Sequence, residues 1–61
     1  MVYESVIYWS KEDNCYIGEV PKLPGCFADG CSYKDVREKL EVVIGEWIET
    51  AISLGREVPE P

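Results

Sequence analysis

Hydrophobic and polar positions in the first third of the chain predict two strands joined by a turn. Residues 2–10, VYESVIYWS, are rich in the β-branched and aromatic side chains typical of strands. Their alternation places large apolar groups on both faces of this first strand. The polar cluster at residues 11–14 is typical of a turn. Residues 15–20, CYIGEV, form a second apolar run, so we expect an antiparallel hairpin.

Prolines and glycines are concentrated in the next segment, EVPKLPGCFADGCS at residues 19–32. Pro21 should end the second strand because proline has no N–H to donate to a strand ladder. Pro24 fixes φ near −65° and Gly25 can adopt a positive φ, which together predict a type II turn. We expect a short third strand at residues 26–28 and a further turn at Asp29-Gly30.

Beyond Ser32 the apolar residues recur in steps of three and four, which predicts an amphipathic helix over residues 33–54. Ser32, with Asp35 three residues later, is close to a capping box, and Gly55 is typical of a helix stop. The predicted core-facing stripe comprises Val36, Leu40, Val43, Ile44, Trp47, Ala51 and Leu54.

The order of these elements predicts an α+β fold. We expect a small antiparallel sheet of three to four strands with one long helix on one face, in the order β-β-β-α-β. The last strand would be a short edge strand at Glu57 and Val58, ended by the prolines that follow.

A single helix can cover only one face of such a sheet, so some apolar residues should stay uncovered. Tyr8 and Ile17 belong to this uncovered set in the strands, and Ile48 lies toward the outer side of the helix. Gly45 lies in the interior of the predicted helix, where a glycine costs about 1 kcal/mol of stability relative to alanine. A helix or backbone that packs closely against it would explain this glycine. Scattered surface apolar residues are the alternative, but we favour self-association as a homodimer or homotetramer. The candidate self-association residues are Tyr3, Ile7, Trp9, Val42, Gly45 and Ile52.

Composition narrows the range of partners. The 61 residues are 46% hydrophobic, which indicates one globular domain over residues 1–61 with a marginal core. Twelve acidic and six basic residues give a net charge of −6, which disfavours direct DNA or RNA binding and favours a basic protein partner, unless the charge serves only solubility. The sequence shows no membrane span and no signal peptide, so we expect a cytoplasmic protein without membrane association.

Three cysteines and no histidine leave little basis for nucleophilic or zinc chemistry. Cys15, Cys26 and Cys31 lack a base to accept a proton, and their spacing does not suit a zinc site. We expect reduced thiols that pack as small apolar residues, with a Cys26–Cys31 bridge as an open alternative.

Several carboxylates near the predicted strand ends offer a different chemistry. Asp13, Glu19, Asp29 and Asp35 have the oxygen ligands that Mg²⁺ prefers. Asp29 and Asp35 also suit a turn and a first helical turn, respectively. We therefore expect no catalytic residues, no metal and no cofactor.

The central loop carries a family resemblance. The segment from Tyr16 to Pro21, the P-x-L-P-G-C motif and the capped helix followed by G-x-x-V-P-x-P resemble the HicB-like antitoxin family over nearly the whole chain. Lys22, Cys31-Ser32 and Asp35-Val36 stand where that family usually has Asp, Asp-Thr and Glu-Ala. The family's signature loop corresponds to Pro21, Leu23, Pro24, Gly25, Cys26, Asp29, Gly30 and Ser32, and outside it Trp47, Ile48, Gly55, Val58, Pro59 and Pro61 also match.

The resemblance implies a partial ribonuclease-H-like fold without the catalytic carboxylates of true nucleases. It also implies the antitoxin half of a toxin–antitoxin pair, whose partner is a HicA-type toxin, a small basic ribonuclease of double-stranded-RNA-binding fold that cleaves mRNA. Family members form dimers or tetramers and often carry a C-terminal DNA-binding domain. We expect no such domain here, because the sequence ends at Pro61.

An acidic surface that covers the toxin's RNA-binding surface would explain neutralisation, with charge speeding the encounter. An orphan HicB-like oligomer with a ligand-binding or metal-dependent nuclease-like role is the alternative. The candidate toxin-binding residues are Glu12, Asp13, Glu38, Glu41, Glu46 and Glu49.

Overall fold

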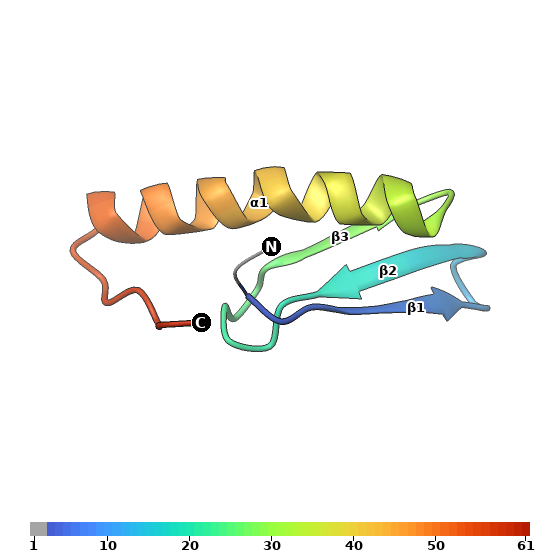
Figure 1. The fold of residues 1–61 in the computed structure, drawn as a ribbon, viewed down its shortest axis with the longest axis horizontal. Coiled ribbons are helices and arrows are strands. Elements are labelled where there is room, and N and C mark those ends of the chain that lie inside the picture. The colour runs from blue at the N-terminus through green and yellow to red at the C-terminus, as the bar shows by residue number, and fades with distance from the viewer. Residues whose placement is uncertain (1–2) are drawn as a thin grey trace.

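The computed structural model describes residues 3–61 and has four regular elements. They are β1 (Val6–Ser10), β2 (Cys15–Glu19), β3 (Phe27–Gly30) and α1 (Tyr33–Ser53). The strands form one antiparallel sheet in the order β1-β2-β3, and α1 lies along one side of it (Figure 1). The predicted α+β class is confirmed. The predicted fourth strand is wrong, because residues 56–61 contain no strand.

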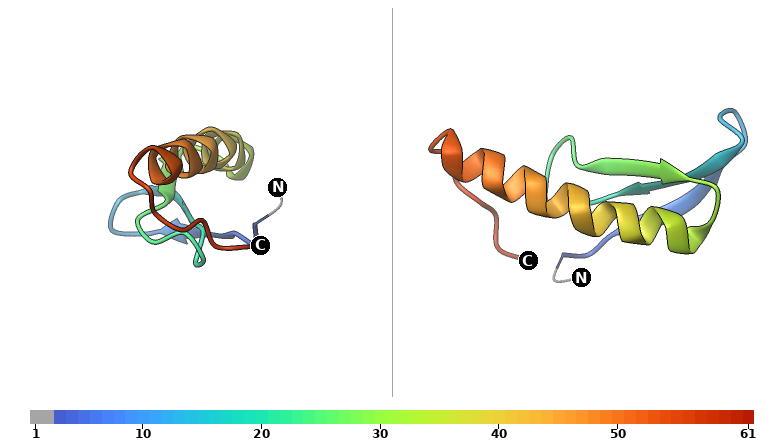
Figure 2. Two further views of the ribbon diagram at one scale, coloured as in Figure 1. Left: turned by 90° about the vertical axis from the view of Figure 1, so that its left-hand side faces the viewer. Right: turned by 90° about the horizontal axis from the view of Figure 1, so that it is seen from above.

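The two-layer arrangement leaves part of the helix beyond the sheet. From above, the C-terminal half of α1 extends past the strands, over the loop between β2 and β3 and the C-terminal tail (Figure 2). The helix packs mainly on β3 and β2 and least on β1. A 21-residue helix spans about 30 Å, whereas these strands have four or five residues each.

The N-terminal hairpin forms as predicted but starts later. Ser10 pairs with Cys15 across the four-residue turn, in which Asn14 adopts a positive φ of 52°. The first strand starts at Val6, so the prediction that it begins at Val2 is wrong for residues 3–5, and Val2 itself lies outside the described residues. Tyr3 is buried instead, and its hydroxyl donates a hydrogen bond to the carbonyl oxygen of Pro59. This bond ties the start of the chain to its tail without a fourth strand.

The loop between β2 and β3 contains the predicted type II turn. The Cys26 N–H donates to the Leu23 carbonyl at 2.9 Å, and Gly25 has a φ of 81°. Leu23 is fully buried, and the Trp47 indole N–H donates to the Pro24 carbonyl at 2.9 Å. These contacts hold the loop under the helix. The predicted turn at Asp29-Gly30 is wrong, because both residues belong to β3.

A substitution at Gly25 tests this turn. We expect Gly25→Val to lower the melting temperature by about 5–15 °C, because a β-branched residue at positive φ costs about 1–3 kcal/mol in a domain this small. A Cβ at this position would meet no atom within 4 Å, so the loss would come from the backbone conformation alone. Gly25→Asn is the control, since asparagine tolerates this region better. Identical melting curves for Gly25→Val and the parent, followed by circular dichroism, would contradict the assigned turn.

Both ends of α1 are capped as the sequence predicts. Ser32 is the N-cap, and its hydroxyl accepts the Asp35 N–H at 3.1 Å. At the other end Gly55, with a φ of 72°, donates to the Ile52 carbonyl, and Arg56 donates to the Ala51 carbonyl. This pair of bonds is a Schellman motif. The predicted range of residues 33–54 is therefore confirmed to within one residue, with Leu54 as the C-cap.

The core lies between α1, the sheet and the β2–β3 loop. Leu23, Val36 and Leu40 are its fully buried side chains. Two predictions about the helix faces are wrong. Leu54 is 62% exposed, because the helix has already passed the sheet at that point, and Ile48 packs against the core instead of facing outward. The other core residues are Tyr3, Val20, Cys26, Ala28 and Ile44, with Ile7, Tyr16, Val43 and Trp47 packed against them.

Candidate protein-docking surfaces

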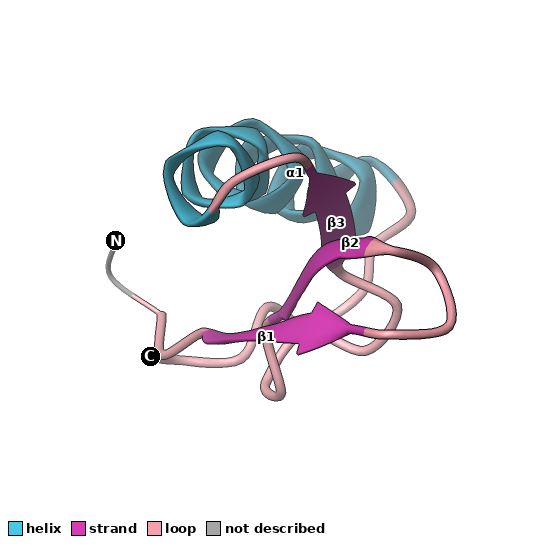
Figure 3. Ribbon diagram, turned by 90° about the vertical axis from the view of Figure 1, so that its right-hand side faces the viewer, coloured by secondary structure: helices cyan, strands magenta, loops and turns pink. Residues whose placement is uncertain are grey.

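The sheet has one face that no helix or strand of residues 3–61 covers, as seen from the side in Figure 3. The strand register sets its composition in cross-strand rows: Val6 pairs with Glu19 and Glu19 with Phe27, while Tyr8 pairs with Ile17 and Ile17 with Asp29. We call this surface the outer sheet face and define it as Val6, Tyr8, Ser10, Cys15, Ile17, Glu19, Phe27 and Asp29.

Apolar side chains on the outer sheet face are largely exposed. The exposed fraction is 46% for Val6, 43% for Tyr8 and 63% for Phe27, and the carboxylates of Glu19 and Asp29 lie among them. Desolvation, followed by the nearby Glu19 carboxylate, raises the pKa of Tyr8, so its phenol stays protonated at neutral pH. This surface is therefore an apolar patch with acidic groups inside it.

The register also corrects two of the predicted self-association residues. Tyr3 is buried, and Ile7 lies in the row Ile7–Gly18–Ala28 on the helix side, packed against the core. The prediction that these two residues lie on an uncovered surface is wrong. Trp9 lies on the same face of β1 as Ile7 but is 50% exposed, and its ring packs edge-on against Tyr16.

Sequence reasoning missed Val6 and Phe27 as members of the uncovered surface. The sequence did hold a signal for Val6: a four-residue turn pairs Ser10 with Cys15, and alternation from that pair places Val6 with Tyr8 and Ile17. Phe27 required the register of β3, which the predicted turn at Asp29-Gly30 had obscured.

The outer side of α1 is a second uncovered surface. Val42, Gly45 and Ile52 are exposed there, as the helical spacing predicts. A Cβ on Gly45 would meet nothing within 4 Å, so no other part of residues 3–61 comes close enough to explain this glycine.

The predicted toxin-binding carboxylates are all exposed but occupy different parts of the molecule. Glu12 and Asp13 lie in the hairpin turn, at the end where α1 begins, whereas Glu46 and Glu49 lie toward the other end (Figure 1). All three basic residues of α1 precede Leu40, and none lies in its last turn. The C-terminal half of the helix is therefore purely acidic.

A shallow groove runs beside this acidic half of α1. Apolar side chains of Val43, Trp47, Ala51 and Leu54 line it, and Glu46, Thr50 and Arg56 complete its walls. We call it the C-terminal groove. It combines an apolar floor with carboxylates on the adjoining helix surface, as protein-binding surfaces do.

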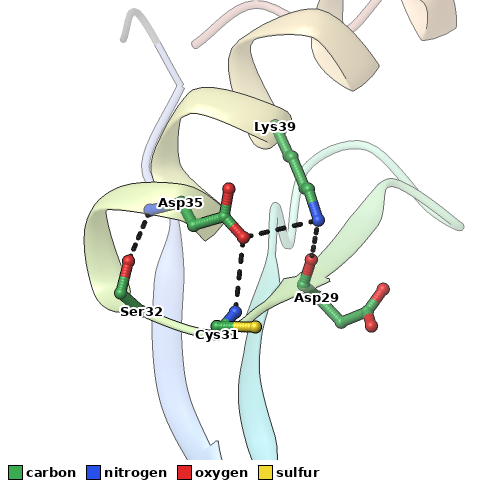
Figure 4. Close-up of polar contacts among 5 residues, drawn as sticks. All are labelled: Asp29, Cys31, Ser32, Asp35 and Lys39. Atoms are coloured by element: carbon green, nitrogen blue, oxygen red, sulfur yellow. Dashed lines mark hydrogen bonds and ion pairs between the residues drawn. The ribbon is translucent and has the colours of Figure 1, made fainter.

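The four carboxylates weighed for Mg²⁺ binding do not form one site. Within residues 3–61, no three Cys, Asp or Glu side chains come together in a way that could hold a metal ion. Asp35 is engaged in capping: its Oδ2 accepts the Cys31 N–H at 3.3 Å and lies 3.4 Å from the Lys39 Nζ (Figure 4). Lys39 also donates to the Asp29 carbonyl at 3.0 Å, which blocks part of the open edge of β3.

All three cysteines are free. Cys26 is buried just before β3 and Cys31 is exposed just after it, so four strand residues separate them. Since a strand rises about 3.3 Å per residue, their Cα atoms lie well beyond the reach of a disulfide. The open alternative of a Cys26–Cys31 bridge is therefore wrong.

Comparison with known proteins places the chain in a family. The model for the family described as UPF0150-like matches residues 3–59. The chain belongs to the UPF0150-like family. It is 36% identical to a UPF0150 protein of Synechocystis sp. over 59 residues, which is 97% of this chain and 80% of that protein. It is 33% identical to a UPF0150 protein of Thermoplasma acidophilum over 55 residues, with 90% and 80% covered.

No solved structure matches this UPF0150-like chain significantly. Across residues 3–61, no helix combines the length and the apolar character that crossing a bilayer requires. The names of the two UPF0150 relatives state no activity, so the physical features of the surfaces must support any functional conclusion.

Proposed function

We propose that this protein acts as an antitoxin that binds and neutralises a small basic HicA-type mRNA-cleaving toxin by covering the toxin's RNA-binding surface. The observation that carries the proposal is the purely acidic C-terminal half of α1 beside the C-terminal groove. The resemblance of the central loop to HicB-like antitoxins supplies the identity of the partner.

The position of these carboxylates argues for a binding role. A helix C-terminus carries a partial negative charge and is stabilised by cations. Glu46 and Glu49 are near that end, and the last turn itself has no basic residue; Arg56, just beyond the C-cap, is the nearest cation in the chain sequence and shares the groove wall with Glu46. Helix stability therefore does not explain these charges, whereas attraction of a basic protein surface does.

Apolar area next to the charges would supply affinity. Charge complementarity mainly speeds the encounter, and buried aromatic anchors dominate binding energies. Trp47 lines the C-terminal groove, and its indole N–H is already bonded to the Pro24 carbonyl, which holds the ring in place. An anchor that is ordered before binding loses less conformational entropy on binding.

We assign the outer sheet face to a second copy of this chain. Phe27, Val6 and Tyr8 form an exposed apolar patch, which small monomers rarely leave uncovered. A two-fold interface would bring the same patch together from both copies. Because like charges repel, the Glu19 and Asp29 carboxylates of the two copies would have to lie apart or stay hydrated in this interface. Phe27, the most exposed of the three apolar side chains, would be its main contact.

Co-expression with a HicA-type toxin tests the antitoxin proposal. We expect the two proteins to co-purify, and we expect mRNA cleavage by the purified toxin to stop when this chain is added in equimolar amount. A Trp47→Ala variant tests the groove: it should fold less stably, so its folded fraction is measured by circular dichroism, and the folded fraction should still bind less tightly than the parent. Absence of a complex, together with unchanged mRNA cleavage, would overturn the proposal.

A further inference from the structure

We propose that Cys15 and Cys31 form a thiol pair that a small-molecule disulfide such as oxidised glutathione converts into a cross-strand disulfide between β2 and β3. The pair lies at the end of the sheet where β3 leads into α1. The inference concerns a covalent modification site and does not depend on the antitoxin role.

The register of the sheet places the two residues opposite each other. Tyr16 pairs with Gly30 and Gly18 pairs with Ala28. In an antiparallel ladder the two residue numbers of every pair have the same sum, and the numbers of Cys15 and Cys31 have that sum too. At the opposite end of the ladder, the Val20 N–H donates to the Cys26 carbonyl at 3.1 Å, so the same register extends one pair beyond the strand end there. Extending the register by one pair past Tyr16 and Gly30 places Cys15 opposite Cys31.

The hydrogen-bond alternation makes this a non-hydrogen-bonded pair. Val20 and Cys26 form a hydrogen-bonded pair, and pairs at even steps from it, including Tyr16 with Gly30, share that type. Cys15 and Cys31 lie an odd number of residues from the Val20–Cys26 pair and therefore form a pair of the other, non-hydrogen-bonded type. In agreement, the Cys31 N–H points away from β2 and donates to the Asp35 carboxylate. Opposite residues of a non-hydrogen-bonded pair have Cα atoms about 4.5 Å apart, which lies within the range of about 4.4–6.8 Å that a disulfide spans.

The two side chains are also on the same face of the sheet and accessible. Alternation puts Cys31 on the same side of β3 as Asp29, and Figure 4 shows the Cys31 sulfur pointing toward the side on which the Asp29 side chain lies. Cys31 is exposed and Cys15 is half-buried on the outer sheet face. Cys26, in contrast, is buried at the other end of β3.

The surroundings set the order of attack. Desolvation, followed by the Asp29 and Asp13 carboxylates and then by Cys31, raises the pKa of Cys15. Its thiolate is therefore scarce at neutral pH, and the exposed Cys31 attacks first. The Cys31 thiolate displaces one glutathione thiolate and forms a mixed disulfide. The Cys15 thiolate then attacks the Cys31 sulfur, and the second glutathione thiolate leaves. Two cysteine thiols are oxidised, one glutathione disulfide is reduced to two glutathione thiols, and the leaving thiolates take up the two protons.

Mass spectrometry of the folded 61-residue chain in a glutathione redox buffer tests the pair. We expect a loss of two hydrogens without bound glutathione, and a fall from three alkylatable thiols to one after unfolding. Cleavage after Lys22 and Lys34 should leave the Cys15 peptide linked to the fragment 23–34, which contains both Cys26 and Cys31. The Cys26→Ala variant should give the same linked species, which assigns the bridge to Cys31. Cys15→Ser should retain glutathione on Cys31, and Cys31→Ser should form no bridge.

Thermal melting gives a second measurement. The bridge closes a loop of about 17 residues, so the oxidised chain should melt at least about 5 °C above the reduced chain, and Cys15→Ser should show no such shift. Three thiols that remain alkylatable after equilibration, a bridge that includes Cys26, or a bridge formed only between two chains would each overturn the proposal.

Discussion

Gly18→Val is expected to abolish most of the folded population at room temperature. An alanine Cβ at this position would already lie 2.6 Å from the Val36 Cγ1 and 2.7 Å from the Leu40 Cδ1, both in the fully buried part of the core. Overpacking of this kind costs about 1–3 kcal/mol for one added group, and valine adds more. A domain of this size has only about 3–5 kcal/mol of stability. Urea denaturation followed by tryptophan fluorescence would measure the loss.

Two further variants separate close packing from other effects at Gly18. Glu19→Val adds the same side chain to the neighbouring position of β2, but on the outer sheet face, and should change the free energy of unfolding by less than about 0.5 kcal/mol. Gly18→Ala combined with Val36→Ala removes the closest clash, so the double variant should lose less stability than the sum of its single variants. A Gly18→Val protein as stable as the parent would show that α1 does not approach β2 this closely.

Neutralising the carboxylates of α1 that follow Leu40 is expected to produce the largest functional effect. We expect Glu41→Gln, Glu46→Gln and Glu49→Gln together to slow association with the basic toxin by about tenfold or more at low salt, because steering depends on local charge. The effect should shrink as the salt concentration rises, since screening shortens the reach of each charge. Stopped-flow or surface-plasmon-resonance kinetics at several salt concentrations would measure it.

The matched control removes the same charge elsewhere. Glu4→Gln, Glu57→Gln and Glu60→Gln are exposed and also change the net charge from −6 to −3. If the helix surface meets the toxin, this control should slow association much less than the helix variant. Equal slowing by both sets would mean that only the overall charge matters, and would remove the helix from the binding surface.

Local chemistry explains the features that the sequence predicted well. The helix bounds follow from Ser32 and Gly55, since each residue makes its capping contacts with atoms a few residues away. The turn at Pro24 and Gly25 is equally local. The position of this turn under Trp47 is not a local feature, because the indole that donates to the Pro24 carbonyl lies 23 residues later in the chain.

Features that depend on distant contacts were predicted less well. Alternation alone assigned large apolar groups to both faces of the first strand, so it did not decide which face the helix covers. The contact of Gly18 with Val36 and Leu40 decides it, since only the face without a Cβ at this point lets the helix approach closely. On that face Ile7 packs against the core, whereas Val6 and Phe27 stay exposed on the outer sheet face.

The sequence by itself determined the α+β class, the capped helix, the hairpin and the surplus of negative charge, because these depend on neighbouring residues or on composition. Only the tertiary structure decided which apolar residues remain exposed, that the acidic half of α1 borders a groove, and that Cys15 lies opposite Cys31. Strand register is the physical reason: a shift of one residue moves every side chain of a strand to the other face, and contacts across the fold fix that register.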